Sequence, residues 1–265
     1  MNDIYELSQG TSPLLISLPH AGTKIPRELQ KLYTPKALLV EDTDWHLDIL
    51  YNFVIDDGAS LIVPEFSRYV IDLNRPPEDT AMYAGVNNTG LCTLTDFEGV
   101  SIYKDGYAPD AANIEHRRLN YWQPYHSALD AELARIKAIH GFAILLDGHS
   151  IKSSLPWLFE GTLPDLNIGT VNGSSCAIDL RNAISELLNQ QIDFSSVMDG
   201  RFKGGYITRH FGNPSQNTHA VQLEMCWSTY MQEQAPFVID PSRVSKISVF
   251  LQQLTRLLAV GPTHA

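Results

Sequence analysis

Residues 142–150 read FAILLDGHS, and five apolar residues lead directly into Asp147, Gly148 and His149. A short continuous apolar run is typical of a strand that is buried on both faces of a parallel sheet. In open α/β sheets, ligands bind beyond the carboxyl ends of such strands. The stretch therefore predicts an α/β fold in which an imidazole and a carboxylate reach the functional edge of the sheet.

Two further apolar runs end in the same way. Residues 14–18 (LLISL) are followed by Pro19 and His20, and residues 219–223 (HAVQL) are followed by Glu224. If these strands are neighbours of the one that carries His149, two imidazoles and a glutamate meet at one edge of the sheet. A hydrolytic metal site requires such a convergence.

The remaining pattern alternates strands with helices, which predicts a mostly parallel sheet covered by helices on both faces. The expected helices are residues 26–32, 34–54, 111–139 with a bend or break at Pro124, 176–190, and 241–258 with Asp240 as N-cap. Further strands are expected at residues 60–63, 69–73, 168–171 and 205–210. Residues 78–110 are rich in Gly, Asn, Thr and Asp, and we interpret them as a long ordered excursion over the active face.

The composition restricts the class of partner. The chain has 265 residues, of which 44% are hydrophobic and 18% charged, so residues 1–265 are expected to form one domain with a full core. With 19 basic and 30 acidic residues the net charge is -11, which argues against nucleic acid or an anionic membrane as the main partner. A small anionic substrate remains compatible, because a few well-placed arginines can hold it.

The cysteines and the N-terminal sequence predict a cytoplasmic protein. Cys92, Cys176 and Cys226 are an odd number without paired spacing, which favours neither a disulfide framework nor a cysteine zinc site. The start of the chain is acidic and has no apolar run, so no signal peptide is expected. No apolar segment approaches the roughly 20 residues of a membrane span. The sequence carries no signal for a particular oligomeric state.

A catalytic zinc ion takes three protein ligands and leaves one position for water. His20 and His149 are two candidates, and residues 41–48 (EDTDWHLD) are the obvious source of a third. On the expected helix, Asp44 and Asp48 are four residues apart and share a face, so one can bind the metal while the other orients a ligand. We expect Asp44 to be the ligand, with Asp48 and Glu41 as alternatives. The acidic run can instead be a solvated helix face.

Two arginines flank the expected strand at residues 69–73. A planar guanidinium can bind a carboxylate through two hydrogen bonds or place a fixed positive charge next to an oxyanion. Arg68 and Arg75 can each serve one of these two roles. The alternative is that they form surface ion pairs with Glu65 or Asp72.

Glu224 and the basic segment 201–210 complete the candidates. A carboxylate at the end of a buried strand can act as a general base, although a strand-end glutamate paired with an arginine is an equally ordinary structure. Arg201, Lys203 and Arg209 surround a glycine pair in an otherwise acidic chain. We interpret this segment as a wall for an anionic substrate, against the alternative of an ordinary basic hairpin.

Taken together, these segments resemble the N-formylglutamate deformylase family, also called the N-formylglutamate amidohydrolase family. The resemblance runs from the first strand to Glu224. Its motifs are LPHAG (18–22), TDWHLD (43–48), SRYVIDLNRPP (67–77), DGHS (147–150), RFKGGYITR (201–209) and QLE (222–224).

The resemblance implies a three-layer α/β/α fold that is similar to zinc exopeptidases and aspartoacylases. In those relatives the second metal ligand is a glutamate three residues after the first histidine, whereas this chain has Thr23 there. That departure is why Asp44 is needed as a ligand. Arg68 and the Asn74-Arg75 pair match the aspartoacylase arrangement, in which the first arginine polarises the scissile carbonyl and the Asn-Arg pair holds the substrate carboxylate.

The implied reaction is the metal-dependent hydrolysis of N-formyl-L-glutamate to formate and L-glutamate, the last step of one bacterial route of histidine degradation. Glu224 is expected to be the general base and Arg68 to stabilise the oxyanion. A divalent metal, with zinc expected, is held by His20, Asp44 and His149, and the substrate is bound by Asn74, Arg75, Arg201, Lys203 and Arg209.

Two alternative functions stay open at this point. The first is a deacylase of another N-acyl amino acid, such as an N-acylaspartate or N-succinylglutamate. The second is a non-catalytic binding protein for such a ligand, although pure binding has no need of Glu224. A nucleophilic serine enzyme is disfavoured, because Ser150 lacks the Gly-x-Ser-x-Gly elbow.

Overall fold

The computed structural model describes residues 4–80 and 89–262. Within these ranges, seven strands form one sheet in the order β1-β3-β2-β4-β7-β5-β6. The strands are β1 (Tyr5–Ser8), β2 (Leu14–Ser17), β3 (Ser60–Pro64), β4 (Ala143–Ile151), β5 (Leu166–Gly169), β6 (Ser196–Met198) and β7 (Thr218–Cys226). The α-helices are α1 (Arg27–Gln30), α2 (Leu47–Tyr51), α3 (Phe53–Asp56), α4 (Ala111–Arg117), α5 (Gln123–His140), α6 (Ile178–Gln190), α7 (Tyr206–Phe211) and α8 (Pro241–Val260).

The sheet is mixed and mostly parallel, as expected. β2 pairs in parallel with β3 and β4, β4 pairs in parallel with β7, and β5 pairs in parallel with β6. β1 and β3 are antiparallel, and so are β5 and β7. The three strands that carry the predicted site are therefore neighbours, and their carboxyl ends meet at one edge.

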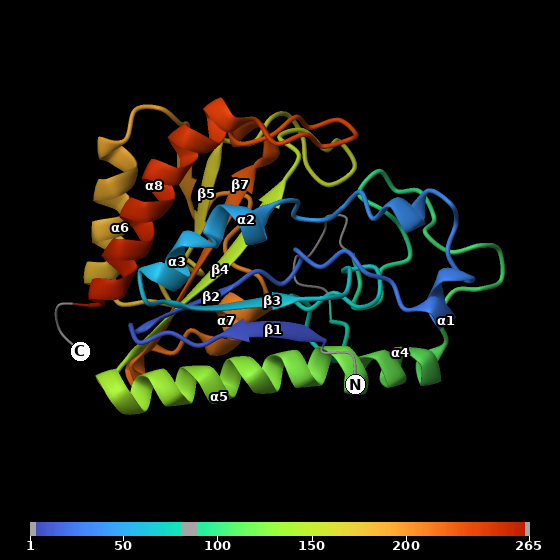
Figure 1. The fold of residues 1–265 in the computed structure, drawn as a ribbon, viewed down its shortest axis with the longest axis horizontal. Helices are drawn as coiled ribbons and strands as arrows, with labels where there is room; N and C mark the ends of the chain where they lie inside the picture. The colour runs from blue at the N-terminus through green and yellow to red at the C-terminus, as the bar shows by residue number, and fades with distance from the viewer. Residues whose placement is uncertain (1–3, 81–88, 263–265) are drawn as a thin grey trace.

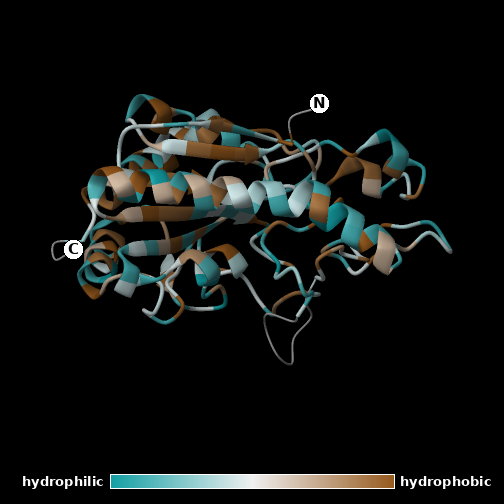
Figure 2. Cartoon of the chain, turned by 90° about the horizontal axis from the view of Figure 1, so that it is seen from below, coloured by the Kyte–Doolittle hydropathy of each residue, from teal (hydrophilic) through white to brown (hydrophobic). Residues whose placement is uncertain are grey.

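Helices cover both faces of this sheet and produce three layers (Figure 1). Alternate residues of β4 point to opposite faces: Ile144 packs into a core with α2, α3, α6 and α8, whereas Leu145 packs into a core with α5 and α7. Figure 2 shows hydrophobic strand segments next to helix ribbons that alternate between hydrophobic and hydrophilic colours, as amphipathic covering helices do. No described helix is long and apolar enough to cross a membrane.

The helix expected at residues 34–54 is wrong in its first half. A 3-10 turn at Ala37–Leu39 ends at Val40, whose φ of 47° is left-handed, and α2 begins only after His46, whose φ is 63°. Each left-handed residue breaks the i→i+4 hydrogen bonds of a helix. Asp44 therefore lies in a turn, where its N–H donates to the His20 carbonyl at 3.0 Å, and it does not share a helical face with Asp48.

The strand expected at residues 69–73 is also wrong, because this segment has no ladder partner. Its peptide groups are satisfied by other parts of the chain: the Asp72 N–H donates to the Leu91 carbonyl at 2.7 Å, and Arg117 donates to the Val70 carbonyl at 3.0 Å. The local apolar pattern resembles a strand, but its side chains pack between α4, α5 and the sheet without pairing with it.

Residues 205–210 form a helix and not the expected strand. α7 begins after Gly205 and places Ile207 and Phe211, which are four residues apart, in the core under the sheet. Tertiary packing of this apolar pair overrides the local pattern.

The other expectations fare better. α6, α8 and the Asp240 cap are confirmed, since the Asp240 carboxylate accepts from the N–H groups of Ser242 and Arg243. The helix expected at residues 111–139 is present without a break at Pro124, which lies in the first turn of α5; the winding changes just before it, in a π-helical turn at Arg118–Trp122. Of the excursion at residues 78–110, positions 81–88 lie outside the described residues, and positions 89–110 contain no helix or extended strand.

Glu132 on α5 ties the helix layer to the sheet. Its buried carboxylate accepts hydrogen bonds from the side chains of Gln9, Ser60 and Arg135. Burial alone raises the pKa of Glu132, but these hydrogen bonds outweigh it and hold the pKa below its ordinary value.

We predict that Glu132→Gln lowers the free energy of unfolding at pH 7 by about 1.5–3 kcal/mol, because charge-assisted hydrogen bonds are lost. Since the pKa is lower in the folded state, the stabilisation is present above the unfolded value of about 4.3 and is lost as the pH falls through the folded value. Urea unfolding at pH 7 and at pH 4 measures this. Equal differences at both pH values would contradict it, and Glu115→Gln in the exposed Glu115–Arg118 pair is the control that should change nothing measurable.

Candidate active site

A cleft with a cavity volume of about 80 Å³, partly open to solvent, lies at the carboxyl ends of β2, β4 and β7. Three strands supply His20, His149 and Glu224, as their sequence positions predicted. The turn before α2 adds Asp44, and the irregular segment after β3 adds further polar residues. The predicted residues that line the cleft are His20, Asp44, Arg68, Asn74, Arg75, His149, Arg201 and Glu224.

His20, Asp44 and His149 form a group that can hold a metal ion. All three are at most 3% exposed, and one donor atom from each lies within 4.8 Å of the others. Asp44 Oδ2 is 3.1 Å from His149 Nδ1 and 3.7 Å from His20 Nδ1, so both rings present the same nitrogen to one carboxylate oxygen. Asp48 is exposed on α2 and Glu41 lies outside this group, so neither alternative ligand joins it.

The far nitrogen of each histidine meets a buried aspartate. His20 Nε2 is 2.7 Å from Asp72 Oδ1, and His149 Nε2 is 3.0 Å from Asp147 Oδ1. Asp147 Oδ1 has no hydrogen-bond partner among the described residues, and His149 Nε2 also lies 2.8 Å from Asn74 Nδ2. A histidine whose second nitrogen donates to a carboxylate is the usual arrangement of metal ligands. The donor set therefore fits a divalent cation.

The pKa values of the two histidines move in opposite directions. Burial, reinforced by the Arg68 charge, lowers the pKa of His20 despite the raising effect of Asp72. Burial lowers the pKa of His149 as well, but Asp147, Asp44 and Glu224 outweigh it and hold that pKa well above its ordinary value. His20 is thus neutral at pH 7, with a lone pair for a metal, whereas a cation that binds His149 displaces a proton.

Arg68 is the central cation of the site. Its Nη2 donates to Asp72 Oδ2 at 2.7 Å, its Nη1 is 3.9 Å from Asp44 Oδ1, and its guanidinium lies 4.7 Å above the ring of Phe97. The alternative ion pair with Asp72 is thus present, but it is buried and not on the surface. Burial raises the pKa of Asp72, yet Arg75, His20 and Arg68 together hold it well below its usual range.

Glu224 is directly opposite His149 in the register of β4 and β7. Burial is the largest cause that raises the pKa of Glu224 to about 8. Asp44 raises the pKa further, whereas His149 and Arg68 lower it. Gln222 Nε2 lies 3.4 Å from Glu224 Oε2, and Gln222 Oε1 accepts a hydrogen bond from the Gly205 N–H at 2.6 Å. A carboxyl that titrates near neutral pH is suited to general acid-base work.

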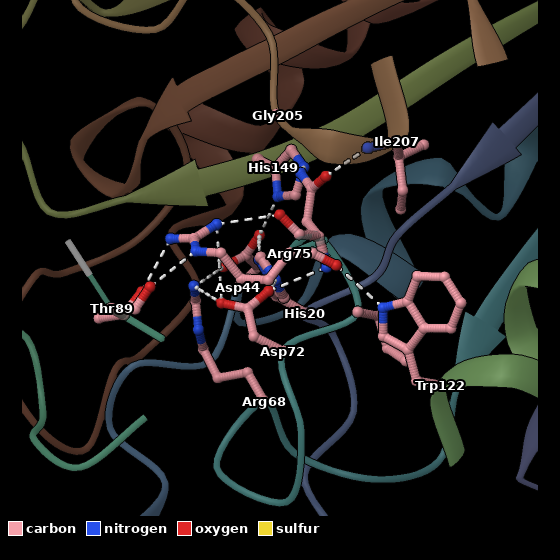
Figure 3. Close-up of polar contacts among 12 residues, drawn as sticks. His20, Asp44, Arg68, Asp72, Arg75, Thr89, Trp122, His149, Gly205 and Ile207 are labelled. Atoms are coloured by element: carbon pink, nitrogen blue, oxygen red, sulfur yellow. Dashed lines mark hydrogen bonds and ion pairs between the residues drawn. The ribbon is translucent and has the colours of Figure 1, made fainter. Parts of the chain in front are cut away.

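Asn74 is fixed from both sides, and two of its partners, His149 and Ile207, are labelled in Figure 3. Its Oδ1 accepts from the Ile207 N–H at 2.8 Å, and its Nδ2 is 3.1 Å from Asp147 Oδ2 and 2.8 Å from His149 Nε2. A Cβ at Gly205 would lie 2.3 Å from Asn74 Nδ2, so the second glycine of the basic segment is required by this close approach.

Arg75 extends from this point into the cleft and is 20% exposed. Its Nε and Nη2 donate to the carbonyl and hydroxyl of Thr89, and its Nη1 donates to the Asn74 carbonyl. These bonds use three of the five N–H groups of the guanidinium, and Nη1 also lies 3.9 Å from Asp72 Oδ2.

The basic segment is only partly in the cleft. Arg201 lines it, with its guanidinium 5.4 Å from the ring of Phe202. In the described part of the chain, Lys203 and Arg209 do not belong to the lining, and Arg209 Nε donates to the Gly204 carbonyl at 2.9 Å.

Some residues in or directly behind the cleft were not expected from the sequence. Asp72 was considered only as an arginine partner, although it lies inside the SRYVIDLNRPP motif. Gln222 carries a signal only through its place in the QLE motif. The apolar wall gave no signal at all, because its members come from four separate segments. This wall consists of Phe97, Ile151, Leu158 and Phe202.

Comparisons with known proteins agree with this geometry. The family model of N-formylglutamate amidohydrolase matches residues 12–231. The chain is 44% identical to N-formylglutamate deformylase of Pseudomonas putida and 42% identical to that of Pseudomonas aeruginosa, each over 98% of both chains. The crystal structure of N-formylglutamate amidohydrolase from Ralstonia eutropha shares the fold, with a TM-score of 0.82 at 22% identity over 97% of both chains. A gene product of Agrobacterium tumefaciens gives a TM-score of 0.76 at 16% identity, covering 98% of this chain and 96% of that one. The chain belongs to the N-formylglutamate amidohydrolase family.

Proposed function

We propose that this protein is a metal-dependent amidohydrolase that converts N-formyl-L-glutamate to formate and L-glutamate, and that residues 1–265 are its single catalytic domain. The observation that carries the proposal is the buried His20–Asp44–His149 group, which shares one cleft with Glu224 and Arg68. The names of the Pseudomonas relatives, at 42–44% identity over nearly the whole chain, support the substrate. A role in histidine degradation and a cytoplasmic location remain predictions.

His20, Asp44 and His149 would hold the cation, and zinc is the metal we propose, because two imidazoles and one carboxylate are a common catalytic zinc set. When bound, such a cation polarises the formyl carbonyl and lowers the pKa of water. Asp72 and Asp147 keep the two imidazole rings in orientation through their far nitrogens.

Glu224 moves the proton in this proposal. In its deprotonated form Glu224 takes a proton from the water that attacks the formyl carbon, and it delivers that proton to the nitrogen of the departing L-glutamate. Arg68 stabilises the oxyanion of the tetrahedral intermediate. Its Nη2 is held by Asp72, while its Nη1 is 3.9 Å from the nearest carboxylate oxygen of Asp44 and faces the cleft.

Recognition of L-glutamate falls to Asn74, Arg75 and Arg201. The formyl group is small, so the two carboxylates of the substrate supply most of the orientation. Among the described residues, the hydrogen bonds that Arg75 makes leave one N–H on each terminal nitrogen for a carboxylate, and Arg201 lines the cleft next to the apolar wall. In this proposal Lys203 and Arg209 contribute positive charge near the cleft but do not contact the substrate.

The apolar wall favours one second candidate, a deacylase of N-acyl amino acids with larger acyl groups. Phe97, Ile151 and Leu158 could pack against an acyl chain that the formyl group lacks. The kcat/KM values for N-formyl-, N-acetyl- and N-succinyl-L-glutamate separate the two candidates. Preference for the larger acyl groups would replace the proposed substrate while retaining the site.

We predict that formate release from N-formyl-L-glutamate disappears when the protein is treated with a chelator and returns when zinc is restored. Asp44→Asn should lower the zinc content well below one ion per chain, because a ligand is removed. Asp48→Asn is the matched control, since it changes the same group on the same segment at an exposed position, and it should keep its zinc. Full activity in protein shown to be free of metal would contradict the proposal.

We predict that Glu224→Gln lowers kcat by about 10²–10⁴-fold, because the proton-transfer group is lost while its shape is kept. The zinc content and the dissociation constant of L-glutamate should stay close to the wild-type values. Glu186→Gln, an exposed glutamate on α6, is the control for the same substitution elsewhere. A Glu224→Gln protein that hydrolyses substrate as fast as wild type would assign the base to another group.

A further inference from the structure

The segment that carries Asn74 and Arg75 is held by side chains of the helix below it. Trp122 Nε1 donates to the Arg75 carbonyl at 3.0 Å, and His126 Nε2 lies 2.8 Å from the Leu73 carbonyl (Figure 3 shows the Trp122 contact). These two carbonyls lie on either side of Asn74. Because the segment is neither strand nor helix, its peptide planes depend on such contacts.

The two donors lie where the helix changes its winding. Trp122 is the last residue of the π-helical turn at Arg118–Trp122, and His126 is four residues further on, in the first part of α5. π-helical turns occur frequently at functional sites. This one brings an indole and an imidazole to the same side of the helix, facing the residues that line the cleft.

Aromatic packing locks both rings. The rings of Trp122 and His126 are stacked with centroids 3.7 Å apart, and the ring of Phe211 lies nearly parallel to that of His126, at 6.0 Å and an interplanar angle of 8°. Burial lowers the pKa of His126 to about 4, so the ring is neutral, and its Nδ1 has no hydrogen-bond partner among the described residues. With its proton on Nε2, His126 donates to the Leu73 carbonyl.

Neither ring lines the cleft, so neither can touch the substrate directly. Their effect passes through the backbone at residues 73–75, which sets the direction of the Asn74 and Arg75 side chains. The Ile207 N–H fixes the Asn74 side chain from the opposite side at 2.8 Å. The Trp122 indole, the His126 imidazole and the Ile207 N–H thus fix the backbone from which the Arg75 side chain extends.

We propose that Trp122 and His126 are positioning residues that set the affinity of the cleft for the substrate carboxylate through Arg75. This inference rests on the proposed function, because it assigns the carboxylate to Arg75. It predicts an effect on binding and not on the hydrolytic step.

The test is Trp122→Phe, which keeps an aromatic ring on His126 and removes the N–H donor. We expect the KM for N-formyl-L-glutamate to rise about fivefold, the factor for one hydrogen bond of about 1 kcal/mol. The dissociation constant of L-glutamate from calorimetry should rise by the same factor, and kcat should stay within about twofold. His126→Phe removes the donor to the Leu73 carbonyl and should act in the same direction, so it serves if Trp122→Phe fails to fold.

Trp227→Phe is the matched control for loss of indole volume. Trp227 is 1% exposed, and its Nε1 has no acceptor among the described residues. We expect this variant to lower Tm at least as much as Trp122→Phe while leaving KM and the L-glutamate dissociation constant unchanged. Wild-type values of both constants in a folded Trp122→Phe protein would overturn the inference.

A double-mutant cycle with Arg75→Ala tests the route of the effect. If Trp122 acts through Arg75, then Trp122→Phe has no further effect on KM in the Arg75→Ala background. The same fivefold rise in both backgrounds would overturn the inference. A wild-type protein that binds L-glutamate but releases no formate contradicts the proposed function alone. In that case the double-mutant cycle is evaluated with the dissociation constants of L-glutamate in place of KM. A wild type that neither binds nor hydrolyses contradicts both.

Discussion

The burial of charge is the constraint on which the rest of this structure depends. Four carboxyl groups lie at or beneath the floor of one cleft, and each is at most 7% exposed: Asp44, Asp72, Asp147 and Glu224. Burying a carboxylate costs several kcal/mol unless it is paired and hydrogen-bonded. Arg68 and the two histidines supply part of the compensation, and a divalent cation at His20, Asp44 and His149 would supply more. The fold brings segments from both halves of the chain together around this charge.

The strand ends could be predicted from the sequence because they combine two independent signals. A run of apolar residues long enough for a buried strand is readable by itself, and the polar residues that follow it stand at the edge where ligands bind. His20, His149 and Glu224 all reached the cleft for that reason. The alternation of these apolar runs with helical segments also predicted the sheet with helices on both faces.

The predictions that failed are those in which long-range contacts decide the backbone. Asp44 was placed in the site by an argument about a helical face, but it reaches the site from a turn between two left-handed residues, Val40 and His46. Residues 69–73 have the composition of a strand, yet their carbonyls are satisfied by Arg117 and His126, which are more than 40 positions away. No local pattern carries such information. For the same reason, the charge cluster at 201–209 predicted a cationic wall but not which of its members faces the cleft.

The pairing of β4 with β7 has a consequence for how this family can change. Nine consecutive pairs fix the register of the two strands, so the separation of His149 and Glu224 is set by the backbone of the sheet itself. Asn74, Arg75, Phe97 and Arg201 are instead carried by segments without regular ladders. The pair proposed to carry out hydrolysis therefore stands on a hydrogen-bonded ladder, and the residues proposed to recognise the substrate stand on irregular segments. In the proposed roles, substitutions around Arg75, Phe97 and Arg201 would change which acylated amino acid is accepted while the separation of His149 and Glu224 stays fixed by the sheet.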